Sequence, residues 1–472
     1  MKDIGRARRR TPRPIKRGDV PVASAAAATS EPDIRASQSL PNDVTDEVSG
    51  GLVVPSPRAD GSLHSVVFPI EMDRDRLALS RFMFEERRIV CRPFHFPWLM
   101  MALSDPAAWH ITLANAAWHR YRKCKAEEFD FASDQEVVKH HRLSLQSIAR
   151  RLADPTKRND EGLVVAIAGL ICHNVENHDR LKVHIEEIQR IAQSKGGLQS
   201  LHNPTLRLMV SWLDLTAASY LNISPRFESP KCLSLEIDPG NDTHCLEQLL
   251  ATWDQKCPDL GDIVSALRVT AAAASYVNRH INDPTLWRDG TAALRVLGPA
   301  LHEILSLEGR PLPSDPGDRS YSARAAREAF RRAALVFIAA VRIRLGFEAH
   351  DMAAHLDAFR QISQLPLVDW AVVPELNLWA HVVAAAREKP EDRAWHVFTI
   401  VSIMQILGLE TADRAFEVAR GVMWVDAISE GDCGLRREID HFASGSLPRR
   451  IQDLQAVSGD VYSASLGSSL GI

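Results

Sequence analysis

The sequence has few cysteines and no pair of them arranged to hold a metal. Seven cysteines are spread over 472 residues, and none of them stands in a C-x-x-C pattern. An odd and scattered set does not build a zinc ribbon or a disulfide framework, and it favours a reducing compartment. Cys172 lies inside an apolar run, so we expect it to be a small core residue.

Long apolar runs are also missing. The most apolar stretches, LVVAIAGLIC and AALVFIAAV, are about half as long as the roughly 20 residues that a bilayer-spanning helix needs. The basic start of the chain is not followed by an apolar stretch, so no secretory signal is predicted. We therefore expect a soluble protein that does not insert into a membrane.

Catalytic motifs are absent or stand in the wrong context. H-E-x-x-H, D-D-x-x-D and a phosphate-cradling glycine loop do not occur. The G-x-S-x-G match at 467–471 is followed only by Ile472, whereas a nucleophile elbow needs a helix after it. The sequence predicts no catalytic residue, no cofactor and no cofactor-binding residue.

One stretch gathers several residues of the types that bind metals. It holds His173, Glu176, His178, His184 and Glu187. A di-iron helical bundle needs two E-x-x-H copies on separate helices, and the only E-x-x-H here lies near the carboxyl end. We interpret the stretch as a polar helix junction and predict no metal ligand.

Charge is nearly balanced over the whole chain, with a formal net charge of −4. Positive charge, however, is concentrated at the start of the chain. The first 20 residues contain eight Lys or Arg residues and two aspartates. Such a run is typical of a nuclear import signal, a nucleic-acid arm, a mitochondrial presequence or a solvated tail without a role. Prolines interrupt the amphipathic helix that a presequence needs, so we favour a nuclear import signal over the other interpretations. The predicted import residues are Arg8, Arg9, Arg10, Lys16 and Arg17.

The composition divides the chain into three parts. Residues 1–65 are rich in Pro, Ser, Ala, Asp and Gly and have few large apolar side chains, so we predict a disordered leader. Residues 66–455 have helical periodicity and form the predicted folded domain. Residues 456–472 are polar and are predicted to be a flexible tail.

The periodicity predicts an all-α, multi-helix bundle-like domain of about a dozen helices. Several starts and ends are marked: Asp105-Pro106 and Asn203-Pro204 are N-terminal signals, and Gly196 suits the left-handed residue after a helix. Between 135 and 154 the predicted buried face is Val138, His141, Leu145, Ile148 and Leu152. Later helices are predicted at 259–282, 290–308, 321–346, 349–363, 373–387, 391–407 and 412–429.

Tryptophans recur at helical core spacing. We interpret them as packing anchors and not as an aromatic cage for a ligand. These are Trp109, Trp118, Trp212, Trp379 and Trp424.

The order of these helices resembles the regulatory domain of fungus-specific transcription factors. In that family a helix ends in paired glycines before a leucine-rich turn, as Gly196-Gly197-Leu198 does here. A helix bearing SWLDL then leads into a loop similar to Pro225-Arg226-Phe227, and AFEVARGVMWVD resembles the closing helix. The resemblance covers roughly residues 70–445 and rests on order and spacing.

The resemblance implies a helical interaction domain in a nuclear regulator. Members usually carry an amino-terminal binuclear zinc cluster with six closely spaced cysteines, but no cysteine precedes Cys91 here. Three explanations stay open: a first exon missing from the gene model, a relative without the cluster, or a protein that pairs with another regulator. The signature that would justify direct sequence-specific DNA binding is missing.

We therefore predict a transcription regulator, not an enzyme, located in the nucleus. It would act through contacts with other transcriptional regulators or the transcription machinery, as a homodimer or heterodimer, with a small ligand as an additional control. One alternative is an all-α enzyme, which a bound metal or a deep pocket with converging carboxylates would favour. The other is a ligand-free helical scaffold, which the lack of a sizeable cavity together with one broad exposed apolar face would favour.

Overall fold

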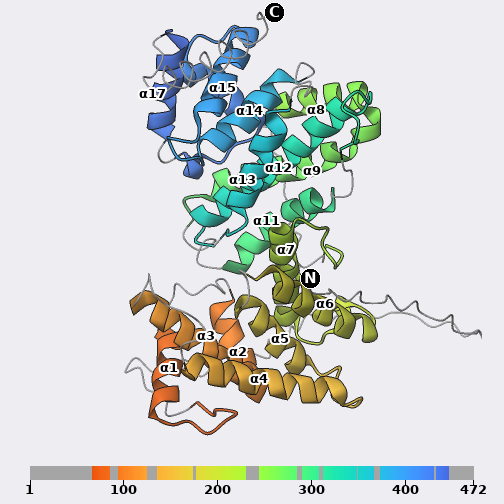
Figure 1. Cartoon of the computed structure of the whole chain (residues 1–472), viewed down its shortest axis with the longest axis vertical. Coiled ribbons are helices and arrows are strands. Elements are labelled where there is room, and N and C mark those ends of the chain that lie inside the picture. The colour runs from red at the N-terminus through yellow and green to blue at the C-terminus, as the bar shows by residue number, and fades with distance from the viewer. Residues whose placement is uncertain are drawn as a thin grey trace, which may run out of the picture. The chain divides into compact units, whose positions relative to one another are not determined.

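A computed structural model gives the fold of the chain (Figure 1). The structure describes residues 66–85, 94–124, 135–173, 177–229, 244–283, 290–307, 312–347, 349–365, 373–429 and 432–445. The predicted disordered leader, the predicted tail and the five predicted import residues lie outside these ranges. In the described ranges the chain is all-α, as the sequence predicts, and contains no β-strand.

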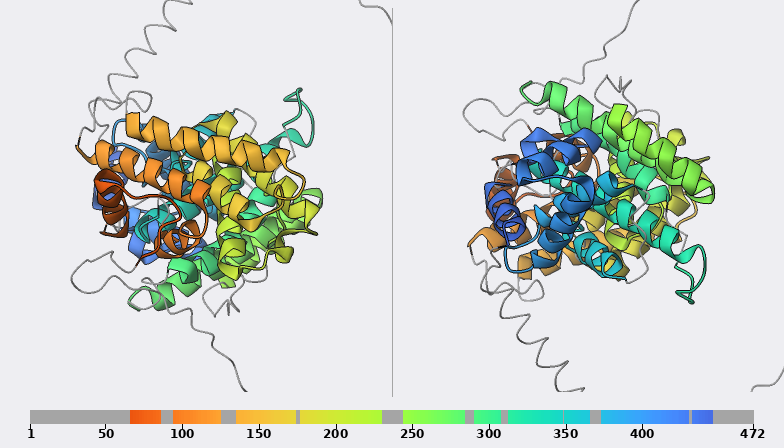
Figure 2. Two further views of the ribbon diagram at one scale, coloured as in Figure 1. Left: turned by 90° about the horizontal axis from the view of Figure 1, so that it is seen from below. Right: turned by 90° about the horizontal axis from the view of Figure 1, so that it is seen from above.

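The described residues form sixteen α-helices with three short 3-10 turns between them (Figures 1 and 2). In chain order the helices are α1 (Arg74–Glu85), α2 (His95–Ala102), α3 (Pro106–Cys124), α4 (Gln135–Ala153), α5 (Glu161–His173), α6 (His178–Ser194), α7 (Pro204–Leu221), α8 (His244–Lys256), α9 (Asp262–His280), α11 (Gly290–Ser306), α12 (Tyr321–Arg344), α13 (Met352–Ser363), α14 (Pro374–Ala385), α15 (Ala394–Leu407), α16 (Ala412–Val422) and α17 (Asp432–Ala443). The 3-10 turns are η2 (Leu198–Ser200), η5 (Pro258–Leu260) and η6 (Asp426–Ile428). The twelve helices expected from periodicity are present, and α1, α2, α8 and α17 are additional.

The predicted helix starts are confirmed by their hydrogen bonds. The Asp105 carboxylate accepts hydrogen bonds from the first free N–H groups of α3, at Ala107 (2.9 Å) and Ala108 (3.0 Å). Asn203 caps α7 in the same way, with its side-chain oxygen 2.9 Å from the Thr205 nitrogen. Each cap satisfies donors that have no partner inside the helix, and the proline that follows it lacks such a donor.

The glycine pair ends α6 in a Schellman turn, in which two backbone N–H groups beyond the helix donate to carbonyl groups of its last turn. The Gly197 N–H donates to the Ala192 carbonyl (2.8 Å) and the Gly196 N–H to the Gln193 carbonyl (3.0 Å). Gly196 has a φ of 98° and Gly197 a φ of 105°, a region that a β-carbon would make costly. The chain then turns into η2, which buries Leu198 against the core.

The predicted buried face of α4 is wrong for Val138 and Leu145. Both are exposed, whereas the buried side chains are those of Val137, His140, Ser144 and Ile148. The helix is rotated by about one residue, so that the small Ser144 and the His140 ring face inward, and the His140 ring lies against His110 of α3 with centroids 5.2 Å apart. Hydrophobicity alone ranks Val138 and Leu145 above these two residues, so the correct face could not be read from the pattern.

The predicted helix over 412–429 is too long. α16 ends at Val422, and Met423 is extended, with φ −168° and ψ 121°. This change of direction places the Trp424 ring in the core and leaves the Met423 carbonyl to accept a hydrogen bond from Trp379 Nε1 (2.7 Å). A buried tryptophan anchor therefore overrides the helical periodicity at this point.

Two helices, α5 and α12, are buried along most of their length. α5 buries every residue from Leu163 to Ile171, as its apolar composition predicts. α12 is the longest described helix and contacts α9, α11, α13 and α14 (Figures 1 and 2). Its many alanines let these neighbours approach closely. Trp109, Trp212, Trp379 and Trp424 are buried and Trp118 is partly buried, which confirms their role in packing.

No single described helix is both long enough and apolar enough to cross a bilayer. α15 and α16 meet the length and composition requirements only when taken together, and the chain bends by 86° between them.

Candidate functional site

Three segments that carry the sequence resemblance meet in space. Asp214, from the SWLDL stretch of α7, accepts hydrogen bonds on one carboxylate oxygen from the backbone N–H groups of Arg226 (2.8 Å) and Phe227 (3.0 Å). The Pro225–Phe227 loop then lies beside the Gly196–Leu198 turn, and together they line a pocket. Motifs separated by about 30 residues therefore form one site.

Asp214 is the buried anchor of this site. Its side chain is almost fully buried, and its second carboxylate oxygen, Oδ1, has no hydrogen-bond partner among the described residues. Burial raises the pKa of Asp214 to about 6, and the two backbone N–H groups and Arg226 oppose this shift. The loop is therefore held by an acceptor that is costly to ionise.

A second contact holds the same loop from α11. The Phe227 carbonyl oxygen lies 3.1 Å from His302 Nε2, which donates the hydrogen bond because a carbonyl oxygen only accepts. α7 also packs against α11. The loop is thus fixed at both backbone groups of Phe227, and the walls of the pocket are pre-formed.

The pocket has a volume of about 610 Å³. It is lined by Gln193, Gly196, Gly197, Leu198, Gln199, Arg226, Phe227, Glu228 and Ser229. Glu228 is the one carboxylate in this lining, so the pocket does not have the several converging carboxylates expected of the alternative enzyme. The presence of this cavity differs from the first of the two features expected of a ligand-free scaffold, the lack of a sizeable cavity.

Among the described residues that line the pocket, Arg226 is the one cation. Its side chain is 11% exposed, and its Nη2 atom lies 3.7 Å from Glu186 Oε1, which is too far for a hydrogen bond. Its Nη1 atom is buried and has no hydrogen-bond partner in the described part of the chain. Sequence reasoning missed both Arg226 and Asp214 as site residues. The signal available was a single acid in the otherwise apolar stretch LMVSWLDLTAAS.

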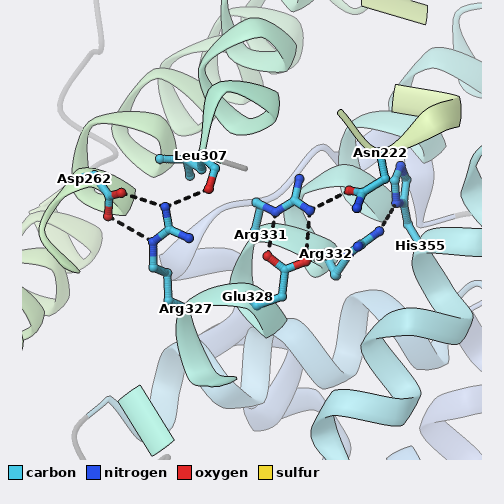
Figure 3. Close-up of polar contacts among 8 residues, drawn as sticks. All are labelled: Asn222, Asp262, Leu307, Arg327, Glu328, Arg331, Arg332 and His355. Carbon is cyan, nitrogen blue, oxygen red and sulfur yellow. Dashed lines mark hydrogen bonds and ion pairs between the residues drawn. The ribbon is translucent and has the colours of Figure 1, made fainter. Parts of the chain in front are cut away.

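A different arrangement of arginines lies on α12 (Figure 3). Arg327 makes two parallel hydrogen bonds to Asp262 at the start of α9, at 3.0 Å and 2.6 Å, and a third to the Leu307 carbonyl (2.8 Å). Such a bidentate pair joins α12 firmly to α9 and to the end of α11.

On the other side of Figure 3, Arg331 and Arg332 share the carboxylate of Glu328. Arg331 also donates to the side chain of Asn222, the left-handed residue that ends α7 (2.5 Å). Arg332 donates to His355 Nδ1 on α13 (2.9 Å), which requires this nitrogen to be unprotonated. Burial is the main cause that lowers the pKa of His355 to about 4, so the ring is neutral.

The predicted polar junction holds two partly buried histidines, His173 and His184. His178 is exposed, and its ring centroid lies 4.5 Å from that of Tyr220. His173 shares a hydrogen bond with Asn115 of α3 and stacks on His141 of α4, with ring centroids 5.0 Å apart. Desolvation lowers the pKa of His173 to about 3 and that of His184 to about 4. Glu176 lies outside the described residues. The described ranges contain no group of three or more His, Cys, Asp or Glu side chains placed to hold a metal ion.

One face of α15 exposes large apolar side chains. Phe398 is 49% exposed and Ile406 is 75% exposed, and both lie on the same side of the helix as the partly exposed Trp395. The Phe398 ring packs edge-on against Phe442 of α17. The Trp395 and Phe398 rings also lie close together, with centroids 6.1 Å apart.

The described residues thus form an all-α fold with a pocket beside the glycine turn and an exposed apolar face on α15. The model of the fungal specific transcription factor domain matches residues 75–365, which is more than half of the chain. The chain belongs to this family. Its members are defined by a regulatory domain and not by an enzymatic activity. No curated protein and no solved structure matches the chain.

Proposed function

We propose that this chain is a nuclear transcription regulator that acts through protein contacts of its helical domain. The family match over 75–365 is the observation that carries the proposal. The sequence holds no set of six closely spaced cysteines, so the proposal relies on contacts with other regulators or the transcription machinery and not on direct reading of DNA bases. Either a homodimer or a heterodimer fits this role.

The exposed face of α15 is the proposed contact surface. Phe398 and Ile406 are large, apolar and solvent-exposed on one side of a helix, which supports burial against a partner. The underlying residues, including Ile400 and Met404, are buried in the domain core. Ile406 is the more exposed of the two outer residues, and replacing Phe398 also removes its edge-on contact with Phe442.

The test tethers the full chain to a heterologous DNA-binding domain upstream of a reporter gene. We expect reporter transcription to change relative to the binding domain alone, and the change to be lost in a Phe398→Ser, Ile406→Ser variant. Val183→Ser is the matched control, because Val183 is 61% exposed on α6, away from α15. Equal reporter output from the chain and from the binding domain alone would refute the proposal.

Nuclear import is proposed to use the basic start of the chain. Replacing Arg8, Arg9, Arg10, Lys16 and Arg17 by glutamine in a fluorescent fusion of the full chain should reduce its nuclear fraction. A distribution unchanged from that of the unsubstituted fusion would remove these residues as the import signal.

A further inference from the structure

The pocket between the Gly196–Leu198 turn and the Pro225–Phe227 loop has the size of a ligand site. Its volume of about 610 Å³ falls within the range of roughly 300–1,000 Å³ that is typical of small-molecule pockets. The backbone around it is fixed by the Schellman turn of α6, by Asp214 and by His302. A pre-formed wall lowers the ordering cost of binding.

The side chains that line the pocket indicate which class of ligand it can bind. Arg226 presents a guanidinium that is mostly shielded from water, and one of its nitrogen atoms lacks a hydrogen-bond partner among the described residues. A buried cation with unused donors is costly unless an anion pairs with it. A guanidinium pairs best with a planar carboxylate, through two parallel hydrogen bonds.

The other lining residues limit the charge and shape of that anion. Glu228 is a negative group at the exposed side, so a ligand with several negative charges would be repelled. Leu198 and Phe227 provide apolar surface, and Gln193 and Gln199 provide amide groups. The occupant should therefore carry one carboxylate and an apolar body.

We propose that this pocket binds a small monocarboxylic acid whose carboxylate pairs with Arg226. The site goes beyond the protein contacts proposed for α15 and does not depend on them. The acid would also contact the glycine turn, where a side chain at Gly196 or Gly197 would narrow the pocket and strain the backbone.

The test uses the full chain and matched pairs of acids and their primary amides. The probes are octanoate and octanamide, 3-phenylpropionate and its amide, and 1-naphthaleneacetate and its amide, each titrated by calorimetry. We expect at least one acid to bind at least about tenfold more tightly than its amide, because only the acid forms charge-assisted hydrogen bonds to Arg226. If no acid of the panel binds better than its amide, the proposal is wrong.

Two variants locate the binding site. Arg226→Gln should weaken binding of the acid by about tenfold or more, whereas Arg190→Gln should not, because Arg190 is an exposed arginine on the neighbouring helix α6. Equal binding by both variants would show that the acid binds elsewhere. Arg226→Lys keeps the charge if the glutamine variant is unstable, and it should still weaken binding because lysine cannot form the parallel pair. Unchanged affinity in that variant would also contradict the proposal.

Discussion

The arginines of α12 and the arginine of the pocket are buried in opposite ways. Arg327 and Arg331 each make two hydrogen bonds to a carboxylate, and Arg342 lies 3.2 Å from the carboxylate of Asp351. Arg226 has no carboxylate within hydrogen-bond distance, although its side chain is only 11% exposed. Arg327 and Arg342 therefore join α12 to neighbouring elements through carboxylates, and Arg331 reaches α7 through Asn222. Arg226, by contrast, has only a long ion pair to Glu186.

Substitutions of the two kinds of arginine should therefore affect stability to different extents. Removing one partner of a buried ion pair strands the other charge, so the α12 pairs should be sensitive to substitution. The ion-pair partner of Arg226 is Glu186, which lies 3.7 Å away and is 48% exposed, so the loss of Arg226 should cost little in the absence of a ligand. The predictions that follow test this contrast.

The largest effect is expected for Asp262→Ala, which leaves the Arg327 guanidinium buried without its carboxylate. We expect the free energy of unfolding to fall by about 3 kcal/mol in urea titrations at pH 7.5. Glu247→Ala is the control, because Glu247 and Arg268 form a pair of similar bidentate geometry at the surface. That control should lose less than about 1 kcal/mol. Equal losses in the two variants would contradict the role given to burial.

A smaller effect is expected for the anchor of the pocket loop. Asp214→Ala removes the acceptor of two backbone N–H groups and should cost about 2 kcal/mol in the same urea titration. Asp214→Asn keeps an oxygen for both groups and should cost less than about 1 kcal/mol. Because the pKa of Asp214 is raised to about 6, the part of its contribution that depends on keeping the proton is present below pH 3.8 and is lost as the pH rises through 6. The two hydrogen bonds from the backbone N–H groups do not depend on that proton, so their contribution remains at pH 7.5. If the asparagine variant had a lower free energy of unfolding than the alanine variant, this account of Asp214 would be wrong.

Lowering the pH is expected to act on the buried ring of His140 and not on the arginine pairs. Burial lowers the pKa of His140 to about 4, so its contribution to stability is complete above pH 6.5 and is lost as the pH falls towards 4. His140→Gln cannot gain a proton and should reduce the loss between pH 7.5 and 5.5 by about 1 kcal/mol. His244→Gln, at an exposed position, should leave the loss unchanged. If the two variants show the same pH dependence in urea titrations, His140 is not held neutral by burial.

Local signals in the sequence predicted much of the fold. The caps at Asp105 and Asn203 and the glycine stop at Gly196 are set by residues within one helical turn, so short-range chemistry was enough. The face of α4 and the end of α16 were predicted wrongly. Both depend on which surface the neighbouring helices offer, and periodicity carries no such information.

The candidate site was less accessible to sequence reasoning. The resemblance picked out Gly196–Leu198, the SWLDL stretch and Pro225–Phe227 as separate marks along the chain. Their convergence follows from the packing of α6 against α7 and from the two hydrogen bonds to Asp214, which are long-range contacts. The predicted import residues lie outside the described part of the chain, so they stay a prediction.

The most direct test of the contrast between structural and ligand-facing arginines compares Arg226→Gln with Arg327→Gln in urea unfolding of the full chain without added acid. We predict a loss of roughly 3 kcal/mol for Arg327→Gln and less than about 1 kcal/mol for Arg226→Gln. Equal losses would contradict the account, because Arg226 would then serve the fold as the arginines of α12 do.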